Sequence, residues 1–148
     1  MPEDTAISER RTPWHLWLIG IVALIWNAVG AYDYLMTQTE NAAYMGRFTP
    51  EQLEYFYGFP TWVVAAWAIA VWGGVLGAIL LLLRKRLAAP VFLVSFLAMV
   101  LTSVYNFVLS GGAEIMGGGA VAFTAVIFVF ALALWLFARA MAARGVLT

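Results

Sequence analysis

A single carboxylate within the apolar stretches of the chain offers the clearest chemistry. Asp33 stands near the end of the first apolar segment, and Asn106 near the end of the third. At about 1.5 Å of rise per helical residue, both come to a similar height in the outer part of a bilayer. Because carboxylates inside a membrane are costly and mark ion or substrate paths, the pair predicts an outward-facing pocket or a proton or cation site. The alternative is structural: Asp33 is hydrated near the interface and ties the first segment to the third through a hydrogen bond to Asn106 or to a tyrosine hydroxyl.

Other polar side chains are expected to gather at this height. They come from three apolar segments, whereas the opposite half of the predicted bundle has little beyond Ser95. The candidate polar or ligand site comprises Asp33, Asn106, Thr102, Tyr34, Tyr105, Thr124 and the deeper Asn27. Amide groups at such positions also serve as hydrogen bonds between helices, so a purely structural role is the alternative here too. We therefore expect any functional site to be accessible from the outer side of the membrane.

Several kinds of chemistry have no residues to carry them. The chain contains no cysteine, which excludes disulfides, iron–sulfur clusters and thiol catalysis. His15 is the only histidine, and alone it lacks companions for a zinc or bis-histidine haem site. The glycines at 117–119 are not followed by the Lys-Ser/Thr of a phosphate-binding loop. We therefore expect no enzyme activity, no metal and no cofactor, and the formal net charge of zero gives no reason to expect nucleic acid as a partner.

Composition places these residues in a membrane protein. Of the 148 residues, 64% are hydrophobic and 11% are charged, against about 25% charged in ordinary soluble domains. Crossing the hydrocarbon core as a helix takes about 20 apolar residues. Four segments satisfy this requirement: Trp14–Met36, Thr61–Leu83, Ala88–Leu109 and Gly118–Ala140. The sequence therefore predicts one all-α domain, an integral membrane four-helix bundle over residues 1–148.

Basic residues predict the orientation of the bundle. With the amino terminus inside, the inner side holds Arg10, Arg11, Arg84, Lys85, Arg86, Arg139 and Arg144, and the outer side holds only Arg47. An excess of Lys and Arg in short cytoplasmic loops is the usual determinant of topology. Both termini are thus expected on the cytoplasmic side.

The loop between the first two segments contains the signature of a short helix. Thr49 and Gln52 have the spacing of a capping box, with Pro50 at the first helical position. We expect a helix over residues 50–57, lying at the outer membrane surface as an interfacial anchor or covering the mouth of the bundle. Gly58 is expected to end it in a left-handed conformation.

Small residues predict how the helices approach one another. In the second segment, Ala70 and Gly74 lie on one stripe, and Gly73 and Gly77 form a GxxxG motif beside it. Small side chains let helix backbones pack closely in lipid, so these residues are expected at contacts inside the bundle. Three tryptophans too deep for the interfacial belt are also expected to pack between helices: Trp26, Trp67 and Trp72.

Four stretches carry a resemblance to known sequences: residues 14–18, 24–34, 48–52 and 57–62. They cover roughly the first half of the chain and resemble a group of short, uncharacterised bacterial four-span membrane proteins, sometimes labelled "sugar transporter". The resemblance implies a bacterial inner membrane and weakly implies transport. It brings no binding residues.

Three functions fit the sequence. The first is an accessory or interaction subunit of a larger membrane complex, working through its helix faces. The second is a transporter or channel component for a small solute, with a site around Asp33 and Asn106; four helices are few for this, so a homodimer or larger assembly is then implied. The third is binding of lipid or quinone in an aromatic-lined groove. Membrane lipids are partners in every case.

Overall fold

The computed structural model describes residues 13–148, which are helical and contain no strand. Four long helices dominate: α2 (Trp14–Gln38), α5 (Thr61–Leu82), α6 (Ala88–Val104) with its π-helical continuation η1 (Tyr105–Leu109), and α8 (Gly118–Ala143). Three short ones lie in the connections: α3 (Ala42–Met45), α4 (Pro50–Tyr57) and α7 (Gly112–Met116). Among these residues, the four long helices are long and apolar enough to cross a membrane. The predicted all-α class with four membrane-length helices is confirmed.

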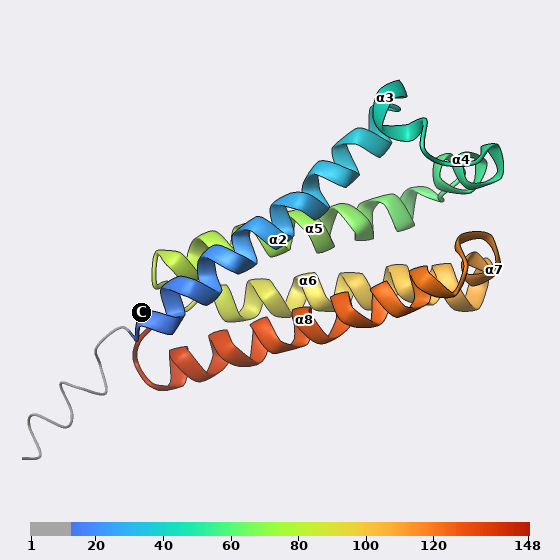
Figure 1. Ribbon diagram of the computed structural model, residues 1–148. Coiled ribbons are helices and arrows are strands. Elements are labelled where there is room, and N and C mark those ends of the chain that lie inside the picture. Colours follow the sequence, from blue (N-terminus) through green and yellow to red (C-terminus); the bar gives the residue numbers. More distant parts are fainter. Residues whose placement is uncertain (1–12) are drawn as a thin grey trace, which may run out of the picture.

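The long helices pack in chain order, α2 on α5, α5 on α6 and α6 on α8. Figure 1 shows two pairs of helices that diverge toward the end carrying α3, α4 and α7. We call this the short-helix end. The opposite end, which carries the turn at 83–87 and the carboxyl terminus, is called the turn end. The turn joins α5 directly to α6, and the two helices pack as antiparallel neighbours.

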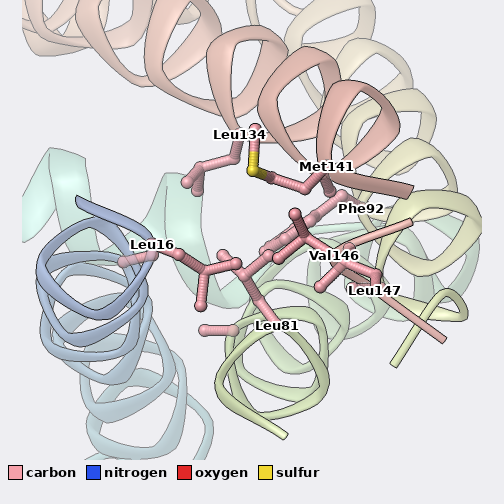
Figure 2. Close-up of a cluster of buried hydrophobic side chains, with 11 residues drawn as sticks. Leu16, Leu81, Phe92, Leu134, Met141, Val146 and Leu147 are labelled. Carbon is pink, nitrogen blue, oxygen red and sulfur yellow. The ribbon is translucent and has the colours of Figure 1, made fainter. Parts of the chain in front are cut away.

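A compact apolar core closes the turn end, as Figure 2 shows. Its larger members come from all four long helices and from the last residues of the chain: Leu16, Leu81, Phe92, Leu134, Met141, Val146 and Leu147. The carboxyl-terminal segment folds back into this core, and Leu147 is only 1% exposed. The Thr148 amide donates to the Arg84 carbonyl oxygen at 2.9 Å, which fastens the segment to the turn.

Glycines of α5 lie against both neighbouring helices. A Cβ added at Gly77 would lie 2.6 Å from ring carbons of Phe92 on α6, and one at Gly73 would lie 3.2 Å from Ser95 Cβ. Gly74 points the other way, against the Asn27 amide of α2. Ser95 Oγ donates to the Ala70 carbonyl oxygen at 2.5 Å. Both small-residue faces of α5 are therefore used inside the chain.

The short helix α4 begins with the reciprocal bonds of a capping box. The Gln52 amide donates to Thr49 Oγ1 at 3.2 Å, and the Thr49 amide donates to Gln52 Oε1 at 3.2 Å. The left-handed ending expected at Gly58 is wrong, because Gly58 has φ −89° and its amide continues the helical pattern to the Glu54 carbonyl oxygen. The chain instead turns left-handed at Gly111 (φ 66°) and Gly117 (φ 88°), on either side of α7.

Candidate functional site

A cavity of about 600 Å³ lies between the two helix pairs. Its walls are mostly apolar and include residues of every long helix and of all three short ones. On α8 the lining residues recur every three or four positions, as in Ala120, Thr124, Ile127 and Ala131, which is the spacing of one helical face. Leu134 forms part of the lining and also belongs to the core at the turn end. That core therefore closes the cavity at the turn end.

Aromatic rings form much of the cavity wall. Trp26 of α2 stacks on Phe130 of α8 with ring centroids 4.9 Å apart, and so closes the gap between helices whose backbones scarcely meet. Trp67 lines the α5 side and meets Phe59 edge to face at 6.0 Å. Trp72 departs from the expectation, because 42% of its surface is exposed, whereas Gly73, Gly74 and Gly77 are the α5 residues that lie against α2 and α6.

One group of polar residues lies at the short-helix end of the cavity, around Asp33. The Tyr44 hydroxyl donates to Asp33 Oδ1. Arg47 Nη2 lies 3.9 Å from the same oxygen, and its guanidinium carbon lies 4.3 Å from the centre of the Tyr44 ring. Asn41 positions Tyr44, because its side chain caps α3 by accepting from the Tyr44 amide at 3.0 Å. Asp33, Tyr44 and Arg47 all line the cavity, and we call them the Asp33 group.

Burial raises the pKa of Tyr44 to about 12, and the hydrogen bond to Asp33 acts in the same direction. Both effects favour the neutral phenol, because an ionised phenolate would face the carboxylate. Arg47 opposes them more weakly. Tyr44 therefore remains a hydrogen-bond donor to Asp33 at physiological pH.

A second polar group joins α4 to the end of α6. The Tyr55 hydroxyl donates to Asn106 Oδ1 at 2.5 Å and lies 2.7 Å from Ser110 Oγ. Asn106 Nδ2 in turn donates to the Thr102 carbonyl oxygen at 2.9 Å. Burial is the main cause of a raised pKa at Tyr55, and the bond to Ser110 opposes it. We call Tyr55, Asn106 and Ser110 the Tyr55 group.

The local backbone of α6 changes where the Tyr55 group is attached. Residues 105–109 wind as a π-helix, and the Ser110 amide reaches back five residues to the Tyr105 carbonyl oxygen at 2.9 Å. Such π-helical turns are rare and occur often at functional sites. Here the wider turn ends at Ser110, whose side chain meets the Tyr55 hydroxyl.

The cavity brings together five of the seven residues predicted for the polar site: Asp33, Asn106, Thr102, Thr124 and Asn27. Tyr34 and Tyr105 are not part of its lining. Tyr34 packs edge to face on Trp67 at 4.9 Å, and Tyr105 does the same on Trp62 at 5.7 Å. Asp33 and Asn106 belong to separate groups, so the expected hydrogen bond between them is wrong. Asp33 does accept from a tyrosine hydroxyl, but that tyrosine, Tyr44, lies on α3 and does not tie α2 to α6.

Deeper in the cavity, three polar side chains are bonded to their own helices. Thr124 Oγ1 donates to the Ala120 carbonyl oxygen at 2.9 Å, and Asn27 Nδ2 donates to the Ala23 carbonyl oxygen at 2.8 Å. Thr102 Oγ1 donates to the Met99 carbonyl oxygen at 2.8 Å. With these donors occupied, the middle of the cavity offers mainly an apolar surface to an occupant.

Sequence reasoning missed four residues of the two groups: Tyr44, Arg47, Tyr55 and Ser110. Three of them lie in the connection before α5, where no apolar period points to them. One signal was present, because Arg47 is the only Lys or Arg between residues 12 and 83. Its isolation in an otherwise acidic connection could have marked it as a binding residue.

Metal binding has no side-chain cluster to support it in residues 13–148, where no three His, Asp or Glu side chains come together. His15 packs against the ring of Phe137 at 5.7 Å.

Helix lengths, apolarity and the cavity define a multi-pass membrane protein with a pocket closed at one end. In comparisons with known proteins, no family model, no curated protein and no solved structure matches the chain.

Proposed function

We propose that this protein lies in a bacterial inner membrane with both termini cytoplasmic, and that its cavity binds the apolar chain of an amphipathic molecule of the lipid or quinone class. The observation that carries the proposal is the cavity itself. Its volume of about 600 Å³ falls within the range of roughly 300–1,000 Å³ that is usual for small-molecule sites. An apolar interior with polar groups at one end matches a molecule that has an apolar chain and a polar head.

The distribution of charge supports the orientation. Arg84, Lys85 and Arg86 lie in the turn between α5 and α6, and Arg139 and Arg144 lie at the same end of α8. Arg47 is at the opposite end, and Arg10 and Arg11 lie outside the described residues. By the positive-inside rule the turn end faces the cytoplasm and the short-helix end faces outward. In this orientation α4 lies at the outer membrane surface and the ligand enters from the outer leaflet.

Closure of the turn end favours ligand binding over transport. A solute crossing the membrane would have to pass the core that contains Leu16, Leu81 and Leu147, each no more than 1% exposed. The accessory-subunit hypothesis drew on the small-residue stripes, the absence of a deep charged site and the small size of the protein. Of the stripe residues, Gly74 and Gly77 already contact Asn27 and Phe92 within the chain. Neither observation argues against a lipid-binding site in the cavity.

The test titrates the purified, delipidated protein in mild detergent with lipid. The thermal unfolding midpoint is measured at each lipid concentration. Monooleoylglycerol is the probe, because it has one apolar chain and no charge. A ligand that binds only the folded state stabilises it by about 2.7 kcal/mol at one hundred times its dissociation constant. We expect a saturable rise in the unfolding midpoint.

Two matched substitutions on α8 locate the effect. Ala131→Phe places a ring in the cavity, since Ala131 is part of the lining, whereas Ala125→Phe places the same ring on the exposed side of the helix. The saturable rise is expected to persist in Ala125→Phe and to disappear in Ala131→Phe. An equal rise in both variants, or none in the unaltered protein, contradicts the proposed site.

A further inference from the structure

Two charged side chains line the cavity among the described residues, and they have opposite signs: Asp33 and Arg47. Both lie at the short-helix end, where the head of a lipid would remain after its chain entered the apolar part. Their side chains are 42% and 59% exposed, so neither is sealed from an incoming group. On the basis of the proposed function, we propose that the ligand is a lipid whose head carries both a phosphate and a primary ammonium group.

Arg47 provides the anion-binding half of this site. Its guanidinium carries five N–H donors in a fork that matches phosphate oxygens. The contact of 3.9 Å between Nη2 and Asp33 Oδ1 is longer than a hydrogen bond, so it leaves room for a phosphate oxygen to bind more closely. Ring contacts with Tyr44 at 4.3 Å and Phe48 at 4.8 Å hold the guanidinium at the cavity mouth.

Asp33 provides the cation-binding half. One carboxylate oxygen accepts from Tyr44, and a carboxylate has about four lone-pair sites, so further donors can be accommodated. Thr37, one turn further along α2, donates to the Asp33 backbone carbonyl oxygen at 2.8 Å and leaves the carboxylate to other groups. A primary ammonium can donate to Asp33, whereas a quaternary ammonium has no N–H to donate.

The closeness of the two charges favours a zwitterionic head over an anionic one. A phosphate at Arg47 also approaches Asp33, whose negative charge offsets much of the attraction. A neighbouring ammonium on the same head cancels that repulsion and adds a charge-assisted hydrogen bond. Specificity is therefore expected to depend on both residues, with Arg47 recognising the phosphate and Asp33 selecting the ammonium.

The experiment compares four lipids with the same single oleoyl chain, using the full chain in detergent and the unfolding midpoint as readout. Monooleoylglycerol has no charge, and the lysophospholipids with phosphoethanolamine, phosphocholine and phosphoglycerol heads differ only in what the phosphate carries. We expect the phosphoethanolamine lipid to bind about tenfold more tightly than the other three, a factor that corresponds to about 1.4 kcal/mol.

Three substitutions separate the two halves of the site. Asp33→Asn is expected to abolish the preference for phosphoethanolamine over phosphoglycerol and to leave both bound. Arg47→Gln is expected to weaken the binding of all three phosphate lipids, with the phosphoethanolamine lipid still the tightest of the three because Asp33 remains, and Arg47→Lys is expected to retain most of the affinity for phosphate. Glu51→Gln, an exposed acid of α4 outside the cavity lining, is the matched control and should leave the order unchanged.

The outcomes distinguish this inference from the proposed function. If monooleoylglycerol binds but all four lipids bind equally, the head-group site is wrong and the apolar cavity stands. If phosphocholine equals phosphoethanolamine, the primary ammonium is not recognised. If no lipid binds the unaltered protein, the proposed function itself fails. The lipid series needs no substitution, so it tests the inference even if Asp33→Asn does not fold.

Discussion

The Tyr55 hydroxyl donates a hydrogen bond of 2.5 Å to the Asn106 side chain, and so connects α4 to the π-helical end of α6. This contact bridges the two helix pairs at the end where they diverge (Figure 1). The same hydroxyl meets Ser110 Oγ at 2.7 Å, so loss of one oxygen atom removes two contacts at once. The Tyr55 hydroxyl therefore joins the two sides of the cavity by hydrogen bonds.

Tyr55→Phe should destabilise the protein by about 1–3 kcal/mol, because Asn106 and Ser110 each lose a partner while the ring remains. Amide exchange across residues 50–57 should accelerate, since α4 then loses its side-chain hydrogen bonds to Asn106 and Ser110. Tyr57→Phe, which alters an exposed tyrosine on the same helix, is the control. Equal exchange in the two variants would show that the bond does not hold α4.

The Tyr44 hydroxyl should lose its proton only at high pH, because its pKa is raised. Its pKa of about 12 in the folded protein lies above the usual value of about 10, so the protonated form is stabilised by folding. That stability is fully present below pH 10 and is lost as the pH rises through 12. The phenolate absorbance of the unaltered protein minus that of Tyr44→Phe should therefore show a midpoint near pH 12. A midpoint near 10 would contradict both the burial of Tyr44 and its hydrogen bond to Asp33.

Gly77→Ala should destabilise the contact between α5 and α6. The added Cβ would lie 2.6 Å from the Phe92 ring, which is buried in the core and cannot move without disturbing it. A loss of about 1–3 kcal/mol is typical of such overpacking. Gly119→Ala on α8 has open space around its Cβ and should be neutral or slightly stabilising. Equal unfolding midpoints for the two variants would contradict close packing at Gly77.

Topology can be measured directly because the chain has no cysteine, so one introduced cysteine is the only thiol. Glu51→Cys on α4 should react with a membrane-impermeant maleimide added to intact cells. Arg86→Cys, in the turn between α5 and α6, should react only after the membrane is permeabilised. The reverse pattern would invert the proposed orientation, and labelling of both positions in intact cells would indicate mixed insertion.

The long helices and α4 were predictable because local signals determine them. Each long helix fills a run of about 20 apolar residues, and the pair Thr49 and Gln52 fixes where α4 begins. The predicted ends of three long helices were displaced by one to three residues, with α2 ending at Gln38, α5 at Leu82 and α8 at Ala143, since helix ends depend on neighbouring contacts.

The site itself was only partly predictable. Rise per residue is constant in a helix, so the sequence placed Asp33 and Asn106 at a similar height, and both residues line the cavity. Their partners could not be inferred. Asp33 accepts from Tyr44 on α3 and Asn106 accepts from Tyr55 on α4, and both tyrosines lie in the connection before α5, where no apolar period indicates which long helix a side chain will meet. The direction of Trp72 likewise depends on which faces of α5 meet α2 and α6.

Lipid retention measures occupancy of the cavity most directly. The unaltered protein, Ala125→Phe and Ala131→Phe would be purified from membranes, exchanged into mild detergent and weighed intact by native mass spectrometry. We predict one bound lipid-class molecule per chain in the unaltered protein and in Ala125→Phe, and none in Ala131→Phe. Folded protein that carries no such molecule, or equal retention by both phenylalanine variants, would contradict the claim that this cavity is a lipid-binding site.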